Sequence, residues 1–155
     1  MEKEDFSKAF LSCPLGLLEV RADSKGVISI LFSGGGKELG DKNCVHLKKV
    51  LKQLKEYFSG QRKEFDFPME LEGTTWQKRV WRELLKIPFG QVTSYSELAK
   101  RLGGKNLARA VAAACAQNKL MLAIPCHRVI GLDGELKGYS GGFRHKKWLL
   151  DFEKK

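Results

Sequence analysis

The sequence predicts an α+β protein: a small N-terminal α/β domain of antiparallel strands over residues 1–72, and a mostly helical C-terminal domain over residues 73–155 that contains a helix-turn-helix. Short segments of alternating apolar and polar residues near the start of the chain are typical of half-buried strands. From residue 47 onward, apolar residues recur at helical spacing. A shift in charge, together with Pro68, predicts a linker near residues 66–73, and 155 residues are enough for two small domains.

The N-terminal domain is predicted to be an antiparallel meander followed by a helix. Strands are expected at residues 10–13, 18–22 and 27–32, because turn signals separate these segments. The glycine-rich residues 33–36 lack the Lys-Ser/Thr pattern of a phosphate-binding loop, so they are predicted to be a flexible connection. A helix ending at Gly60 is then predicted from apolar side chains at helical spacing: Leu47, Val50, Leu51, Leu54 and Phe58.

The C-terminal domain is predicted to begin with two short helices. Thr74 or Thr75 can cap the first of them, which ends before Pro88. Residues 94–97 have the pattern of a capping box and open the second, which ends at the two glycines 103–104.

A third helix follows this glycine break and completes the predicted helix-turn-helix. Asn106 can cap it, and it extends from residue 108 to about residue 117. Its side chains are mostly alanine, which favours helix formation and close packing. Small side chains would also let the helix backbone approach a nucleic-acid groove, with Arg109 long enough to enter it. Helix pairs joined by glycine are common in proteins. The pattern alone is therefore consistent with a helix that only packs within the domain and with a helix that binds nucleic acid.

The excess positive charge lies entirely in the second domain. The chain has a formal net charge of +10. Residues 1–72 carry 12 basic and 12 acidic side chains, whereas residues 73–155 carry 16 basic and 6 acidic ones. This asymmetry favours a polyanionic partner such as nucleic acid, or else a basic surface that only promotes solubility. No apolar run approaches the ~20 residues of a membrane span, and the N-terminus lacks a signal-peptide pattern. We therefore expect a cytoplasmic protein that makes no contact with a membrane. When it is bound to DNA, we expect it to be associated with the nucleoid.

The four cysteines are irregularly spaced, and a disulfide framework is not expected in a reducing compartment. Cys13, Cys44 and His46 would supply three zinc ligands, but there is no CxxC pair and no obvious fourth ligand. We therefore expect no metal. Cys115 lies in the alanine-rich helix and is predicted to pack as a small hydrophobe, which leaves Cys126 as the cysteine with unusual surroundings.

Cys126 lies in the pentapeptide Pro125-Cys126-His127-Arg128-Val129, after an apolar run at residues 120–124 that is predicted to be a buried strand or extended segment. An imidazole and cationic side chains close to a thiol lower its pKa and so favour the nucleophilic thiolate. Neighbouring side chains in an extended segment point apart, so contact between Cys126 and His127 requires a turn or a bridging water.

This pentapeptide resembles the active-site motif of the O6-alkylguanine-DNA alkyltransferases, also called methylated-DNA–protein-cysteine methyltransferases. Several further segments resemble the same family in the same order, and the resemblance extends over nearly the whole chain. These segments are Ser12-Cys13-Pro14-Leu15-Gly16, Ile87-Pro88-Phe89-Gly90, Thr93-Ser94-Tyr95, Ala108-Arg109-Ala110-Val111, Asn118, Gly138-Tyr139-Ser140-Gly141-Gly142, Lys146, Leu149-Leu150 and Glu153.

The resemblance implies direct, irreversible transfer of an alkyl group from the O6 oxygen of guanine to the Cys126 thiolate, with no cofactor. The implied partner is double-stranded DNA containing O6-alkylguanine, bound by a monomer that flips the damaged base into a pocket. The implied catalytic residues are Cys126, His127, Glu153, Tyr95 and Asn118. The implied substrate-binding residues are Val129, Tyr139, Ser140 and Gly141. The implied DNA-binding residues are Arg109, Ser94, Ala108, Ala112, Ala113, Gln117 and Arg128.

The resemblance also implies a role for each catalytic side chain. Glu153 orients the imidazole of His127, which activates Cys126 through a water molecule. Tyr95 donates a hydrogen bond to the base, and Asn118 links the recognition helix to the active-site loop. The chain departs from the family pattern in two places: Ala112-Ala113 replaces a frequent Gly-Gly, and Asn118-Lys119 replaces a frequent Asn-Pro.

Purely structural roles exist for several of these residues. Tyr95 and Tyr139 would serve as core aromatics, Asn118 as a helix C-cap and Glu153 as a solvated tail residue. Arg128 would brace the active-site loop instead of contacting DNA.

Other functions consistent with a helix-turn-helix are a lesion sensor and a transcription regulator. Relatives that only sense the lesion commonly have tryptophan in place of the cysteine, so Cys126 disfavours that function. A Cys-His hydrolase is a further alternative.

Overall fold

The computed structural model describes residues 6–36, 44–131, 134, 139 and 142–154. Backbone contacts divide the chain into two compact units, residues 1–71 and 72–155, called here the N-terminal and C-terminal units. As predicted, the chain combines a three-stranded antiparallel sheet with a following set of helices.

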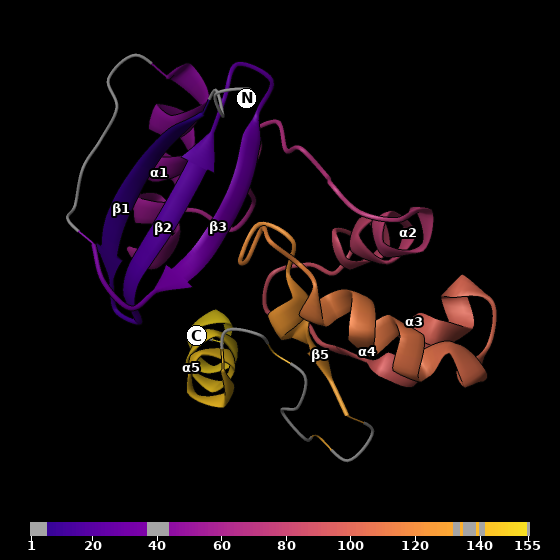
Figure 1. The fold of residues 1–155 in the computed structure, drawn as a ribbon. Helices are drawn as coiled ribbons and strands as arrows, with labels where there is room; N and C mark the ends of the chain where they lie inside the picture. Colours follow the sequence, from indigo (N-terminus) through magenta and orange to yellow (C-terminus); the bar gives the residue numbers. More distant parts are fainter. Residues whose placement is uncertain (1–5, 37–43, 132–133, 135–138, 140–141, 155) are drawn as a thin grey trace. The chain divides into compact units, whose positions relative to one another are not determined.

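The sheet of the N-terminal unit is a meander in the order β1 (Ser7–Cys13), β2 (Gly16–Ala22) and β3 (Val27–Ser33). Cys13 pairs with Gly16 across the first turn, where the glycine has φ +116°, a conformation that L side chains rarely adopt. Helix α1 (Val45–Phe58) covers one face of the sheet (Figure 1). The predicted strands and helix are confirmed.

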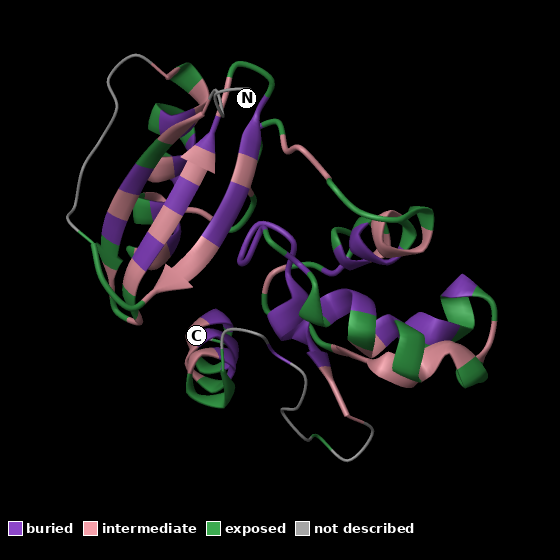
Figure 2. Ribbon diagram, in the orientation of Figure 1, coloured by how far each residue is buried: buried purple, intermediate pink, exposed green. Residues whose placement is uncertain are grey.

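The buried face of α1 differs from the predicted one at its C-terminal end. Leu47, Val50 and Leu54 are buried as expected, but Leu51 and Phe58 are only half-buried. In Figure 2, buried and exposed stretches alternate along this helix. Gln53 and Tyr57 are buried instead. The backbone N–H of Asp66 donates to the Gln53 side chain (3.0 Å), and the ring of Tyr57 lies 5.5 Å from that of Phe65. The segment after α1 therefore covers this side of the helix, a contact that periodicity alone does not reveal.

Part of the predicted linker belongs to the N-terminal unit. The N–H of Val27 donates to the Pro68 carbonyl (2.8 Å), and the N–H of Glu70 donates to the Val27 carbonyl (2.9 Å). Met69 thus forms an isolated parallel bridge with Val27 at the beginning of β3. The boundary between the two units falls after residue 71, inside the predicted linker at residues 66–73, but residues 68–70 are paired with backbone groups at the edge of the sheet.

The C-terminal unit begins with α2 (Thr75–Leu84), which has a complete capping box. The Thr74 side chain accepts from the N–H of Gln77 (3.1 Å), and the Gln77 side chain accepts from the N–H of Thr74 (3.0 Å). Val80, Trp81 and Leu84 are the buried residues of this helix, whereas Leu85 lies beyond the helix and is exposed.

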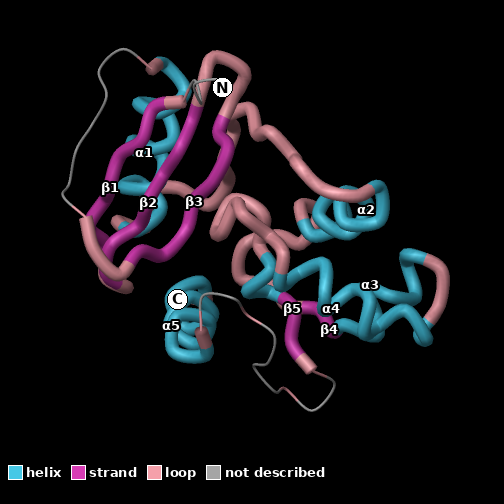
Figure 3. Tube along the Cα trace, viewed as in Figure 1, coloured by secondary structure: helices cyan, strands magenta, loops and turns pink. Residues whose placement is uncertain are grey.

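The predicted helix-turn-helix is formed by α3 (Tyr95–Leu102) and α4 (Ala108–Ala116), which pack against each other (Figure 3). Gly103 ends α3 with φ +140°. Asn106 does not cap α4 as expected. It lies in a short 3-10 turn, η1 (Lys105–Leu107), which leads directly into α4 without a side-chain cap.

The apolar residues 120–124 are not a strand or an extended segment. They form a tight buried turn in which the N–H of Ile124 donates to the Leu120 carbonyl (2.9 Å), and Leu122 has φ +73°. The prediction failed because an apolar run indicates burial and not conformation. Here the backbone groups are paired within the turn instead of along a sheet.

The remaining elements bring distant parts of the C-terminal unit together. Strand β4 (Thr93–Ser94) pairs in parallel with β5 (Val129–Ile130), directly after the 3-10 turn η2 (Cys126–Arg128). Helix α5 (Phe143–Glu153) packs against η2. In the described part of the chain, no helix has both the length and the apolar character needed to cross a membrane.

Candidate active site

Cys126 is the first residue of η2, and its side chain is buried with 2% of the residue exposed. The chain therefore bends at Cys126 and is not extended there. Burial raises the pKa of the Cys126 thiol to about 11, while a hydrogen bond from Asn118 and the charge of Lys146 both lower it. The resting side chain is therefore a protonated thiol that needs a base to become a nucleophile.

Asn118 connects the end of α4 to the loop that carries Cys126. Its Nδ2 donates to the sulfur of Cys126 (3.2 Å) and to the carbonyl of Ile124 (2.9 Å), and its Oδ1 accepts from the N–H of Leu120 (2.9 Å). Its own N–H donates to the Cys115 carbonyl in the last turn of α4 (3.2 Å). One buried amide thus fixes the position of the turn and places a donor at the sulfur of Cys126.

His127 and Glu153 form a buried pair. The two side chains are completely or almost completely excluded from solvent, and His127 Nε2 lies 2.8 Å from Glu153 Oε2. Burial lowers the pKa of the imidazole, which Glu153 opposes. Since a carboxylate only accepts, Nε2 carries the proton in this pair, and a neutral imidazole then has its lone pair on Nδ1. Nδ1 is buried and has no hydrogen-bond partner among the described residues, so it is available as a base.

Arg128 completes this network from the other side of the carboxylate. Its Nε donates to Glu153 Oε1 (2.8 Å), its Nη2 to Glu153 Oε2 (3.0 Å) and its Nη1 to the carbonyl of Ile87 (2.7 Å). Burial alone would raise the pKa of Glu153, but the hydrogen bonds from His127 and Arg128 hold it well below its usual range. Glu153 is therefore an anion that orients His127, and it is not a solvated tail residue.

The expectation that Arg128 binds DNA is wrong for this structure. Only 7% of its side chain is exposed, and all three of its guanidinium nitrogens are bound to Glu153 or Ile87. The guanidinium braces the active-site loop, which was the alternative role. A buried carboxylate at the end of the chain requires a buried cation, and that requirement cannot be seen in the sequence near residue 128.

Two tyrosines adjoin the Cys126–His127 turn. Tyr95 is the first residue of α3 and is half-buried, and burial raises the pKa of its phenol. Tyr139 is buried, with its ring centroid 6.4 Å from that of His127, and burial likewise raises the pKa of its phenol. Both remain neutral hydrogen-bond donors at physiological pH. Val129 is fully buried in β5, whereas Ser140 and Gly141 lie outside the described residues.

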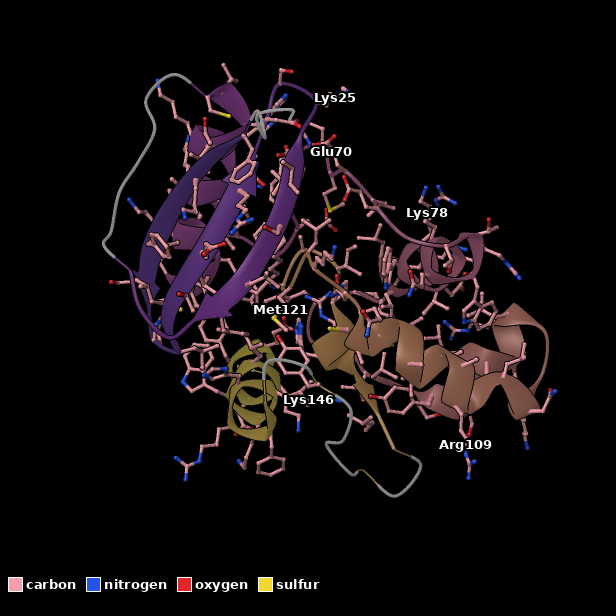
Figure 4. The ribbon with its side chains drawn as sticks, viewed as in Figure 1. Lys25, Glu70, Lys78, Arg109, Met121 and Lys146 are labelled. Atoms are coloured by element: carbon pink, nitrogen blue, oxygen red, sulfur yellow. The ribbon has the colours of Figure 1, made fainter. Side chains whose placement is uncertain are left out.

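Helix α4 presents a face of small side chains. Exposed residues on this helix and its C-cap are Arg109, Ala110, Ala113, Ala116 and Gln117, while Ala108 and Ala112 are half-buried. Figure 4 shows the Arg109 side chain extending away from the ribbon. Ser94, another predicted DNA-binding residue, is the N-cap of α3, where its hydroxyl oxygen accepts from the N–H of Glu97 (3.0 Å).

Two tryptophans of α2 hold α4 in place. The indole N–H of Trp76 donates to the carbonyl of Ala110 (3.1 Å), and that of Trp81 donates to the carbonyl of Ala114 (2.9 Å). Because alanine side chains leave the helix backbone accessible, these bonds reach main-chain groups directly. The small alanine side chains thus allow α2 to pack closely against α4. Other alanines of α4, such as Ala113 and Ala116, are exposed.

Comparison with known protein families gives two adjacent matches. Residues 7–71 match the model of the 6-O-methylguanine DNA methyltransferase ribonuclease-like domain, and residues 75–155 match that of the 6-O-methylguanine DNA methyltransferase DNA binding domain. The chain belongs to the O6-methylguanine DNA methyltransferase family. The family resemblance expected from the active-site pentapeptide is confirmed.

Individual relatives agree with this membership. The methylated-DNA–protein-cysteine methyltransferase of Mycobacterium tuberculosis strain H37Rv is 48% identical over 102 residues, which is 66% of this chain and 62% of the relative's length. That of Methanosarcina acetivorans is 37% identical over 150 residues, 94% of this chain and 96% of the relative. The crystal structure of Mycobacterium tuberculosis O6-methylguanine methyltransferase aligns with a TM-score of 0.86 at 35% identity, over 96% and 93% of the two chains. That of the Mycobacterium tuberculosis OGT in complex with DNA aligns with a TM-score of 0.82 at 35% identity, over 95% and 92%.

The sequence analysis missed several contacts that complete this family site. Ile87 and Gly90, in a segment already noted for its resemblance, contribute a carbonyl to Arg128 and an N–H to Glu153 Oε1 (3.4 Å). Lys146 was noted only as part of a motif, but it is completely buried. Lys146 lies three and four residues before Leu149 and Leu150, the buried apolar residues of α5, and this helical spacing, which places the lysine on their face, was the available signal.

Proposed function

We propose that this protein repairs DNA by transferring an alkyl group from the O6 oxygen of guanine to the sulfur of Cys126. The observation that carries the proposal is the buried Cys126 thiol, held by Asn118 and followed by the His127–Glu153 pair. Membership of the O6-methylguanine DNA methyltransferase family and the helix-turn-helix in the same unit support it.

The proposed reaction uses each buried group in turn. His127 Nδ1 accepts the thiol proton through a water molecule, and the imidazolium that forms is stabilised by Glu153. The thiolate attacks the alkyl carbon, so that the S–C bond forms as the C–O6 bond breaks. Tyr95 donates a hydrogen bond to the base, and the guanine anion that is released takes up, through water, the proton that His127 accepted from the thiol, so that neutral guanine and neutral imidazole result. Because a thioether has no route back to the thiol in this site, each molecule reacts once.

Burial of Cys126 implies that the damaged base leaves the DNA stack. A base inside a duplex cannot reach a thiol with 2% exposure, so the nucleotide is flipped into the site. We propose that α4 enters the groove, with Ala108, Ala112, Ala113 and Gln117 near the DNA and Arg109 occupying the vacated stack, and that Ser94 contacts the DNA from the beginning of α3. In this proposal Val129, Tyr139, Ser140 and Gly141 line the base pocket.

We further propose that the protein acts as a monomer on double-stranded DNA in the cytoplasm. A reaction that consumes one free thiol per molecule fits a reducing compartment. It needs no second subunit, because the catalytic side chains all belong to the C-terminal unit.

The central experiment is intact-protein mass spectrometry after incubation with duplex DNA that contains one O6-methylguanine. We expect one added methyl group per chain, located on Cys126 by peptide mapping, with no further product when substrate is in excess. Continued turnover, as a Cys-His hydrolase would show, or a methyl group on another residue would refute the proposed reaction.

Substitution of Arg109 should separate base flipping from chemistry. Unstacking a base costs a few kcal/mol, so Arg109→Ala should slow repair of duplex DNA by about 10- to 100-fold and leave the reaction with free O6-benzylguanine nearly unchanged. Arg82→Ala removes the same charge from the exposed side of α2 and should not change the ratio of the two rates. Equal losses on both substrates in the Arg109 variant would mean that this residue serves the fold or the pocket.

Methylation of Cys126 should destabilise the protein. The added methyl group enters a buried, packed site, and overpacking typically costs ~1–3 kcal/mol. The thioether is also a weaker acceptor for Asn118 Nδ2. For a chain of this size the melting temperature should fall by about 2–12 °C. Thermal unfolding of unreacted and fully methylated protein, both without DNA, measures this directly, and an equal or higher melting temperature after methylation would show that the site accommodates the group without strain.

A further inference from the structure

Helix α2 makes polar contacts with both helices of the helix-turn-helix. It packs against α3 and against α4 (Figure 1). The indole N–H of Trp76 donates to the carbonyl of Ala110 in α4 (3.1 Å). Nη2 of Arg79 donates to the carbonyl of Leu102, the last residue of α3 (3.2 Å). Two side chains of one helix therefore hold the backbones of the other two.

Trp76 and Arg79 contact each other as well as the neighbouring helices. They are three residues apart in α2, so their side chains leave the same face of the helix. The central carbon of the Arg79 guanidinium lies 5.6 Å from the centroid of the Trp76 ring, within the range of a cation–π interaction. A movement of either side chain therefore disturbs the bond that the other makes.

The two acceptors lie in helices that base flipping must hold in register. Ala110 follows Arg109, which is proposed to occupy the vacated stack. Leu102 ends the helix that begins with Tyr95, the proposed donor to the base. Carbonyl groups in the last turn of a helix lack partners within it and favour a nearby cation. Arg79 supplies that cation to α3 from a different helix.

We propose that Trp76 and Arg79 form a clamp that fixes the beginning of α4 relative to α3 and thereby speeds base flipping. Both are positioning residues, because their contacts are with the backbones of α3 and α4. A recognition helix that is held in place beforehand loses less freedom when DNA binds, so less of the binding free energy is spent on ordering it. This inference rests on the proposed function, since flipping is needed only if the alkyl group comes from a base in DNA.

The test compares repair of duplex DNA with the reaction of free O6-benzylguanine in three variants. Trp76→Phe removes the indole N–H and keeps an aromatic ring, Arg79→Met removes the guanidinium, and the third variant combines both changes. Each single substitution should slow duplex repair by about 2- to 12-fold, the effect of one hydrogen bond, and leave the free-base reaction unchanged. The double variant should be little slower than the slower single variant, because side chains in contact are not independent.

Two matched variants separate the clamp from a loss of charge. Arg82→Met removes an exposed arginine from the same helix and should not change the ratio of the two rates. Arg79→Lys keeps the charge and a donor for the Leu102 carbonyl, so it should recover part of the lost rate. Salt dependence of duplex binding adds a further check. A lost phosphate contact lowers the slope of log K against log salt by about 0.9, whereas loss of the clamp leaves that slope unchanged.

Hydrogen exchange of the protein without DNA provides a measurement that needs no substrate. The amide groups of residues 108–116 should exchange about 2- to 12-fold faster in Trp76→Phe and in Arg79→Met than in Arg82→Met. A protein that repairs no DNA but shows this difference would refute the proposed function and leave the clamp standing.

Several results would overturn the clamp. They are unchanged duplex repair in the single variants, equal losses on duplex and free base, and single losses that multiply in the double variant. A lower salt slope in Arg79→Met would overturn the positioning role of Arg79 and assign it to a DNA phosphate. If Trp76→Phe does not fold at the assay temperature, Arg79→Met and Arg79→Lys decide the matter, because the side chain that they replace is exposed.

Discussion

A Cys126→Ala variant is expected to bind DNA containing O6-methylguanine and to transfer no methyl group at all. The substitution removes the only atom that the proposed reaction alkylates, so the loss should be complete and not partial. DNA binding should persist, because the exposed face of α4 and its bonds to Trp76 and Trp81 do not involve the sulfur. The variant should even remain on the lesion longer than the unaltered protein, since no reaction ends the complex.

The measurement pairs intact mass with fluorescence anisotropy on the same DNA duplex. Cys44→Ala provides the control, because Cys44 lies in the N-terminal unit and is not part of the site. It should take up one methyl group per chain, as the unaltered protein does. A methyl group found on the Cys126→Ala protein would mean that another residue accepts the alkyl group, and a loss of DNA binding would mean that Cys126 also supports the binding surface.

Local sequence was sufficient to predict most of the elements. The strands of the N-terminal sheet are set by alternation and turn residues, and α2 by the Thr74 capping box. In each case the deciding interactions occur between residues close in sequence. The pentapeptide around Cys126 likewise carried the resemblance to the family that the comparisons confirm, although the side-chain donor to its sulfur, Asn118, lies outside it.

The parts that sequence could not predict depend on specific side-chain contacts, some of them between residues far apart in the chain. The turn at residues 120–124 is held by Asn118, and the orientation of Arg128 is set by a carboxylate that lies 25 residues away. Neither partner can be inferred from periodicity. The resemblance to a family supplied Glu153 as the partner of His127 but not as the partner of Arg128, which is why Arg128 was placed on the DNA side.

Glu153→Gln is expected to be strongly destabilising. The substitution keeps the shape of the side chain but removes the charge that two buried groups share, leaving the Arg128 guanidinium without an anion. Breaking a buried ion pair on one side typically costs ~3–5 kcal/mol. The melting temperature of a chain of this size should then fall by about 6–20 °C. Asp151→Asn, in the exposed pair with Lys147 on the same helix, is the control and should cost at most ~1 kcal/mol.

The destabilisation should also depend on pH in a defined direction. The pKa of Glu153 is depressed in the folded protein, so its ionised form adds stability above the unfolded-state pKa of about 4.3. That stability is lost as the pH falls toward the folded-state value. The difference in melting temperature between Glu153→Gln and the unaltered protein should therefore be largest near neutral pH and should shrink below about pH 4. A difference that stays constant over this range would point to altered packing instead of the lost charge.

A double variant decides whether the lost charge is responsible. Most of the expected cost of Glu153→Gln comes from the cation that it leaves buried, so combining it with Arg128→Met should recover part of the stability. The two substitutions together should cost less than the sum of their separate effects by about 0.5–3 kcal/mol, as is usual for residues in direct contact. Additive costs would show that Arg128 finds another partner when Glu153 is neutral, and the carbonyl of Ile87 is the acceptor already bound to it. In that case the carboxylate would serve mainly to orient His127, and the rate of methyl transfer in the Glu153→Gln variant should fall by more than its loss of stability explains.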